Sequence, residues 1–122
     1  MSTRAQIIVK DSSEEIWFYR HSDGYPDGVM PMLEKFLDYV KRGILRDNAM
    51  QSCGWLVLFG AREYDHIHTY DVKIKKFTNI RDTTGMSWKC GSIEPCGPVV
   101  HGDTEYLYTV DVKKKTILVQ GV

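Results

Sequence analysis

The feature that most constrains the fold is a change of hydrophobic period across the segment Tyr19–Pro26. Before it, residues 15–21 alternate as a β-strand does, and β-branched and aromatic side chains are frequent there. After it, apolar side chains recur at steps of three, four and seven residues, which is helical spacing: Val29, Leu33, Phe36, Leu37, Val40 and Ile44. The chain is therefore expected to pass from a strand into an amphipathic helix through this segment.

Both ends of the expected helix carry sequence signals. Asp27 can cap its N-terminus, which places Pro31 among the first four residues, where a missing N–H group is tolerated. At the other end, Arg42 supplies a cation in the last turn and Gly43 can adopt the positive φ that ends many helices.

Two further segments flank this strand–helix unit. Residues 4–11 alternate as a strand, with Gln6 and Lys10 on the side opposite the apolar residues, and are expected to form a hairpin with the strand that follows. Residues 48–62 are expected to form a second helix after a polar N-cap residue. The apolar run Trp55–Phe59 also fits a buried strand between two glycines, so both alternatives stay open at this stage.

The second half of the chain returns to a period of two. Residues 66–74 predict a half-exposed strand, residues 79–87 a loop, and residues 87–93 a short strand. Residues 94–98 contain two prolines and a glycine and are expected to be irregular.

The chain closes on a hairpin in which two alternating segments, 106–112 and 116–120, flank a turn of three lysines, Lys113–Lys115. The sequence thus predicts one α+β domain over residues 1–122. Its N-terminal hairpin and C-terminal strands would form a mainly antiparallel sheet, with one or two helices packed on one face.

The charge balance argues against a direct nucleic-acid partner. Basic and acidic residues number 16 each, so no net field attracts the protein to nucleic acid or to an anionic membrane. The same neutrality removes one barrier to self-association, which leaves a homo-oligomer open. The lysines near the C-terminal hairpin are read as the solubilising lysines of edge strands and turns.

Neither a membrane span nor a leader is recognisable. The longest apolar run, Trp55–Phe59, is too short to cross a bilayer, and Met1 is followed directly by a strand-like segment. The three cysteines form no Cys-x-x-Cys motif. Together these features predict a cytoplasmic protein with reduced thiols and no cofactor.

A candidate site lies in the strand-to-helix segment, where Arg20, His21 and Asp23 surround a glycine turn and Arg4 is expected nearby. The side chains could form a pocket for a phosphate-bearing ligand, in which Asp23 orients His21 as a general base and the arginines hold the anion. The structural alternative, a turn made by Asp23 and Gly24, is favoured. No catalytic residue is therefore assigned.

A second constellation is weaker. His66, His68, Cys90 and Cys96 have the ligand types of a tetrahedral zinc site, but their spacing matches no compact zinc module. Half-buried histidines on a strand face are the favoured interpretation, and no metal is expected.

The segment Tyr19–Pro26, with the sequence Tyr-Arg-His-Ser-Asp-Gly-Tyr-Pro, resembles a motif in a family of small proteins of bacteriophages, prophages and other mobile elements. The start at Arg4, the helix after the motif, and the closing segment His101–Tyr108 with its hairpin are similar to that family as well. The resemblance implies an accessory protein of a mobile element, a class that includes inhibitors of host defence. It supplies no catalytic residue.

On these grounds we expect a non-enzymatic protein that docks on a host protein complex, such as a CRISPR effector, and blocks it by occlusion in the host cytoplasm. The expected surface is the exposed part of the 20–27 loop, including Tyr25, with the acidic helix residues Glu34 and Asp38. The main alternative is an enzyme or ligand-binding protein that uses the arginine–histidine pocket. A structural component of the virion is the third.

Overall fold

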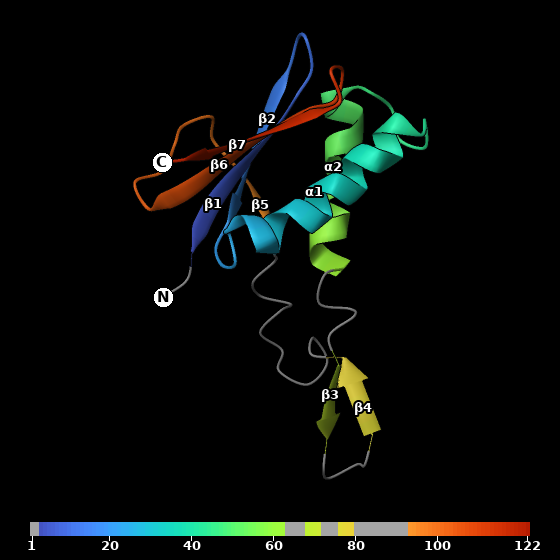
Figure 1. Cartoon of the computed structure of the whole chain (residues 1–122), viewed down its shortest axis with the longest axis vertical. Helices are drawn as coiled ribbons and strands as arrows, with labels where there is room; N and C mark the ends of the chain where they lie inside the picture. Colours follow the sequence, from blue (N-terminus) through green and yellow to red (C-terminus); the bar gives the residue numbers. More distant parts are fainter. Residues whose placement is uncertain (1–2, 63–67, 72–75, 80–92) are drawn as a thin grey trace.

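A computed structural model describes residues 3–62, 68–71, 76–79 and 93–122 (Figure 1). Side chains are described for residues 3–60 and 93–122. Within all the described residues two helices and seven strands follow one another: β1 (Arg4–Lys10), β2 (Glu15–Arg20), α1 (Pro26–Lys41), α2 (Ala49–Arg62), β3 (His68–Asp71), β4 (Lys76–Asn79), β5 (Glu94–Cys96), β6 (Thr104–Asp111) and β7 (Thr116–Gly121). Among these described residues, no helix is long and apolar enough to cross a membrane.

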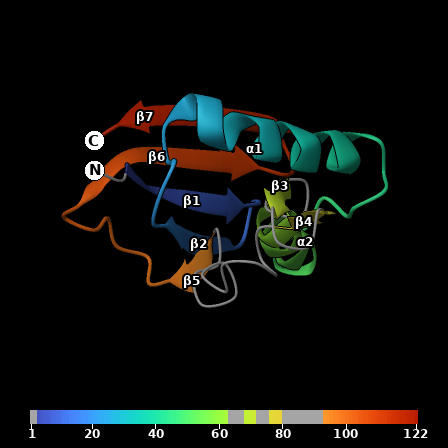
Figure 2. The ribbon, with the colours of Figure 1, turned by 90° about the horizontal axis from the view of Figure 1, so that it is seen from below.

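Five of the strands form one sheet in the order β5-β2-β1-β6-β7, while β3 and β4 pair in a separate two-stranded sheet (Figure 2). Within the larger sheet β1 pairs with β6 in parallel, and the other three pairings are antiparallel. The predicted α+β class and both predicted hairpins, β1–β2 and β6–β7, are confirmed.

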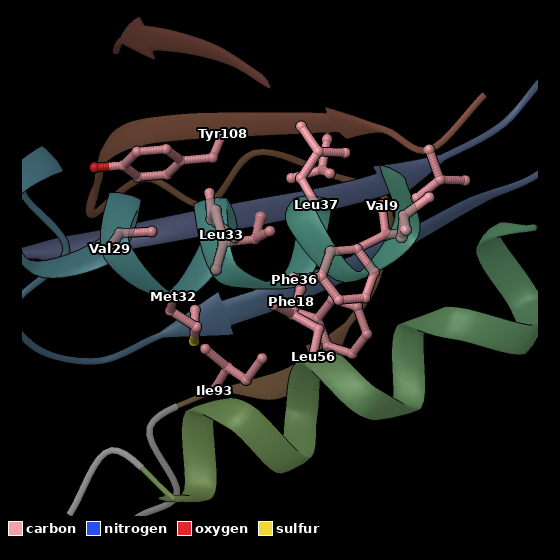
Figure 3. Close-up of a cluster of buried hydrophobic side chains, with 14 of the residues drawn as sticks. Val9, Phe18, Val29, Met32, Leu33, Phe36, Leu37, Leu56, Ile93 and Tyr108 are labelled. Carbon is pink, nitrogen blue, oxygen red and sulfur yellow. The ribbon is translucent and has the colours of Figure 1, made fainter. Parts of the chain in front are cut away.

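The core lies between the larger sheet and the two helices (Figure 3). The apolar side chains of β1, Ala5, Ile7 and Val9, are fully buried there. They belong to one cluster with Leu56 of α2 and with the expected stripe of α1 from Val29 to Val40. We call this side of the sheet the helix-covered face, and the opposite side the far face.

The ends of α1 differ in detail from the prediction. Tyr25 is the N-cap residue, without a side-chain cap bond, and Pro26 occupies the start of the helix. The prediction that Asp27 caps the helix is therefore wrong; it lies in the first turn, where its charge still suits the helix dipole. Because the helix begins earlier than expected, Pro31 lies inside it. Gly43 has φ of 73°, as the stop signal predicted.

Residues 49–62 are a helix, which settles the alternative that the sequence left open. The Asn48 side chain caps it by accepting a hydrogen bond from the Gln51 N–H at 3.0 Å. A second cap comes from Asp11, whose carboxylate accepts a bond from the Ala49 N–H at 2.9 Å. Asp11 also accepts bonds from the amides of Ser13 and Glu14 in the β1–β2 turn, both at 2.8 Å. One buried carboxylate thus joins the hairpin to the start of α2.

This arrangement predicts a pH dependence of stability. Hydrogen bonds from the backbone, the one from Ala49 first, lower the pKa of Asp11 below 3.8 in the folded protein. A lowered folded-state pKa adds stability that is present above about pH 4 and is lost as the pH falls through the folded pKa. We expect Asp11→Asn to be less stable at pH 7 and to lose less further stability on acidification. Urea unfolding at pH 7, 5 and 3 measures this, with exposed Glu14→Gln in the same turn as the control. Parallel pH profiles for wild type and Asp11→Asn would contradict it.

One prediction in the second half needs correction, and others lie partly outside the described residues. The strand expected over residues 66–74 is described only as β3, residues 68–71, and the rest of that range lies outside the described residues. The segment expected to be irregular, residues 94–98, contains β5, which pairs with β2 at the sheet edge. Pro95 is accommodated because an edge strand has one side on which no N–H group is needed. The loop expected over residues 79–87 and the short strand expected over residues 87–93 lie outside the described residues, except that Asn79 ends β4 and Ile93 is not part of a strand.

Candidate functional site: a polar cluster on the far face and a groove between the helices

The residues of the strand-to-helix segment separate onto the two faces of the sheet. Arg20 is only 3% exposed and donates a hydrogen bond from Nε to the Ser22 carbonyl at 2.9 Å. Arg20 pairs with the core residue Ala5 in the β1–β2 register, and opposed residues share a face, so Arg20 lies on the helix-covered side. The rings of Tyr19 and His21 meet edge to face at 4.6 Å, on the far face. Arg20 and His21 therefore do not line one pocket.

The far face carries a group of polar side chains that we call the polar cluster: Arg4, Tyr19, His21, Glu94, His101 and Asp103. His21 Nε2 lies 2.6 Å from a Glu94 oxygen. Arg4 donates a hydrogen bond to the His21 carbonyl, and its Nε lies 4.0 Å from the carboxylate of Asp103. The His101 ring stacks on Tyr19 at 4.8 Å. The structure thus brings two predicted site residues, Arg4 and His21, together with four that were not predicted.

A short hydrogen bond in the polar cluster joins Tyr19 and Asp103. The Tyr19 hydroxyl donates to the Asp103 carboxylate at 2.5 Å. This bond lowers the pKa of Asp103, whereas burial and the bond together raise the pKa of Tyr19 to about 12. Tyr19 is consequently a neutral donor, and Asp103 an ionised acceptor, over the whole physiological pH range.

A buried glutamine positions the loop that carries His101 and Asp103. Gln6 is fully buried, and its amide nitrogen donates to the Val99 carbonyl at 2.9 Å. Its amide oxygen accepts two bonds, from the His101 N–H at 2.9 Å and from the Thr104 hydroxyl at 2.8 Å. Gln6 lies on the side of β1 opposite Ala5, Ile7 and Val9, as predicted, and its side chain is buried because loop 97–103 covers that part of the far face.

Asp23 and Gly24 lie in a turn, which is the geometry that the structural interpretation expected. Asp23 adopts a positive φ of 54°. The Gly24 N–H donates to the Thr3 carbonyl at 3.0 Å, and the Gly24 carbonyl accepts from the buried Tyr108 hydroxyl at 2.7 Å. The exposed Tyr25 hydroxyl lies 3.4 Å from a carboxylate oxygen of Asp23. Asp23 does not orient His21, whose ring is paired with Glu94 instead.

The acidic residues of α1 lie on the side of that helix nearest β7. Glu34 and Asp38 line a shallow depression of about 260 Å³ together with Lys41 and Lys115. Asp38 also pairs with Arg42 at 3.3 Å, one helical turn away. Cations are thus interleaved with the expected acidic surface, which reduces its negative potential.

A larger hollow, which we call the apolar groove, lies between α1 and α2. It measures about 520 Å³, and its walls are mainly aromatic and aliphatic: Tyr39, Ile44, Trp55, Leu58 and Phe59, with Lys35 at its margin. Tyr39 and Phe59 meet edge to face at 5.4 Å, and the Lys35 ammonium lies 5.0 Å above the Phe59 ring. Ile44 was expected in the core stripe, but it follows the helix and is 55% exposed.

Sequence reasoning missed the groove for a definable reason. Leu56 is fully buried and belongs to the buried stripe of α2. Trp55 and Leu58 lie off that stripe, and they are 49% and 40% exposed. Large apolar residues outside the buried stripe of a confirmed helix are the signal that could have indicated an exposed apolar surface.

The cysteine and histidine constellation is only partly described. His66 and Cys90 lie outside the described residues, while Cys96 accepts a weak bond from the Gln6 amide at 3.5 Å. Within the described residues, no group of three or more histidine, cysteine or acidic side chains could hold a metal ion. Comparisons of the chain with protein-family models, with curated proteins and with solved structures gave no match.

Proposed function

We propose that the protein is a non-enzymatic accessory protein of a phage or other mobile element, which docks on a host protein complex in the cytoplasm and blocks it by occlusion. A defence effector such as a CRISPR complex is the proposed target. The family resemblance of Tyr19–Pro26 and of the closing hairpin supports the biological context. The apolar groove is the single structural observation that supports binding.

The groove has the composition of a protein interface. Contiguous exposed apolar surface commonly marks an interaction site, and tryptophan and tyrosine dominate the energetic centres of interfaces. Trp55 and Leu58 provide exposed apolar area, and Met50 on the same helix is 62% exposed. Lys35 adds a cation at the margin, in keeping with a polar rim around an apolar centre.

The polar cluster supports a structural role more than a reaction. His21 is paired with Glu94, and Asp103 is bonded to Tyr19. These side chains satisfy one another's hydrogen-bonding groups and fix loop 97–103 against the sheet. For this reason we place the proposed docking surface at the apolar groove, and no longer at the 20–27 loop with Glu34 and Asp38.

Plaque assays test the proposal. The protein would be expressed in a set of bacterial strains, each of which carries one CRISPR effector directed against a test phage. We expect the wild-type protein to increase the number of plaques that the phage forms on at least one of these strains. Trp55→Ala should then weaken binding of the purified effector of that strain about tenfold or more, the usual loss at an interface hot spot. Trp55 is half exposed, so its removal should leave the melting temperature nearly unchanged.

Val99→Ala is the matched control, because Val99 is 67% exposed and lies in the loop on the far face. It should bind as wild type does. If the Trp55→Ala protein increases plaque formation as much as wild type does, the interface lies outside the apolar groove. A wild-type protein that increases plaque formation on none of the strains and binds none of their effectors would reject the proposed function.

A further inference from the structure

The strand β7 presents an open edge of the larger sheet. It is the last strand in the order, and within the described residues it pairs only with β6. In an antiparallel strand every second residue directs its N–H and C=O groups away from its neighbour, so β7 offers a row of unpaired donors and acceptors. Edge strands are usually protected by charges or proline, yet Thr116–Gly121 contains neither.

The residues of β7 form a pattern that reads the same in both directions. Leu118 is at the centre, Ile117 and Val119 flank it, and the polar Thr116 and Gln120 lie outside them. Strand register places Leu118 on the far face, because it pairs with Thr109, which pairs with Ile8. Leu118 is 55% exposed.

This symmetry specifies how two copies of β7 could pair. In an antiparallel pair about a two-fold axis at Leu118, each Leu118 opposes its symmetry mate. Ile117 then opposes Val119, and Thr116 opposes Gln120, in both halves. Opposed side chains lie on the same face of a sheet, so apolar residues meet apolar residues on both faces. A shift of register by two residues would set Leu118 against the polar Thr116 or the polar Gln120.

The charges at the two ends of the β6–β7 hairpin are also complementary in this arrangement. Its turn carries Lys113–Lys115, and its open end carries Glu105, whose carbonyl accepts a bond from the Val122 N–H. Antiparallel pairing brings the turn of one copy toward the Glu105 end of the other. Because the net charge is zero, no overall repulsion opposes the encounter.

We propose that the partner of the β7 edge is a second copy of this chain, and that the two larger sheets join through β7 into one continuous sheet in a two-fold dimer. The surface buried by one strand pair is small, so the dimer is expected to be weak and concentration-dependent. The interface is separate from the apolar groove, and the inference does not depend on the proposed function.

The first test is the mass in solution from low micromolar to near-millimolar concentration, by sedimentation equilibrium. We expect a monomer–dimer equilibrium for wild type. Leu118→Lys should weaken it about tenfold or more, because two like charges would oppose each other at the centre. Val99→Lys places the same charge on an exposed apolar site outside the strand and should dimerise as wild type does. An equimolar mixture of Leu118→Lys and Leu118→Glu should restore dimerisation.

The second test determines the register, that is, which residues of the two β7 strands oppose each other. Opposed residues of an antiparallel pair have Cα atoms about 4.5–5.5 Å apart, within the range of a disulfide. In a background with Cys53, Cys90 and Cys96 changed to serine, Leu118→Cys should therefore form a disulfide-linked dimer on mild oxidation. Gln120→Cys, on the same face, would lie roughly 13 Å along the strand from its mate and should not.

Three results would overturn the inference. One is a wild-type protein that stays monomeric throughout the concentration range. Another is a dimer that Leu118→Lys leaves intact. The third is equal disulfide formation by Leu118→Cys and Gln120→Cys, which would indicate random collision in place of a defined strand pair.

Discussion

Gln6→Leu is expected to lower the free energy of unfolding by about 3 kcal/mol, although leucine fills a similar volume and is more apolar. The substitution removes the hydrogen bonds to Val99, His101 and Thr104, together with the weak bond to Cys96. Thr104 is only 5% exposed, so water cannot readily replace its lost partner. Each unsatisfied buried group costs about 1–3 kcal/mol, which outweighs the gain from an apolar side chain.

Urea unfolding measures the stability change, and amide hydrogen exchange at His101 reports whether the loop has lost its anchor. Gln51→Leu is the control, because Gln51 is exposed on α2 and its replacement should change stability by less than about 0.5 kcal/mol. A Gln6→Leu protein as stable as wild type would mean that the far-face loop contributes nothing to folding.

The second large effect is expected from a matched pair of helical glycines. Alanine normally stabilises a helix interior by about 0.5–1 kcal/mol relative to glycine. At Gly54 in α2 an added methyl group meets no atom within 4 Å, so Gly54→Ala should show this gain. At Gly28 in α1 the methyl carbon would lie 2.4 Å from the Asp23 carbonyl oxygen.

That oxygen belongs to a backbone that cannot yield easily, because Asp23 already adopts a positive φ and the next residue, Gly24, is held by two hydrogen bonds. Gly28→Ala should therefore destabilise the protein by about 2 kcal/mol, a typical cost of overpacking, despite its better helix propensity. Thermal and urea unfolding of the two variants side by side give the comparison. Equal stabilisation by both would show that the turn relaxes at little cost.

Local hydrophobic patterns in the sequence were sufficient to predict most of the helices and strands of the fold. The strands β1 and β2, the helix α1 and the closing hairpin were predicted because each shows its own hydrophobic period over six or more residues. The strand β5 was missed because it has three residues, one of them proline, and it exists only through its pairing with β2. A segment so short has no period of its own to detect.

The candidate site was less accessible to such reasoning because its parts are distant in the chain. Gln6 alternates with apolar neighbours and so looks exposed, while its partners lie more than ninety residues later. The polar cluster likewise joins His21 to Glu94 and Tyr19 to Asp103. These contacts follow from sheet order and loop path, which local periodicity does not encode.

The parallel pairing of β1 with β6 determines when the protein can fold during synthesis. In this pair Ile7 lies beside Tyr108, so β1 cannot pair with β6 until residue 108 and its neighbours have left the ribosome. The hairpin β1–β2 and the helices can form early from local contacts, but one edge of β1 stays open meanwhile. Long-range pairings of this kind slow folding and expose edges to aggregation. A nascent chain of this protein would consequently depend on rapid completion of its last strands, or on chaperones, to reach the native state.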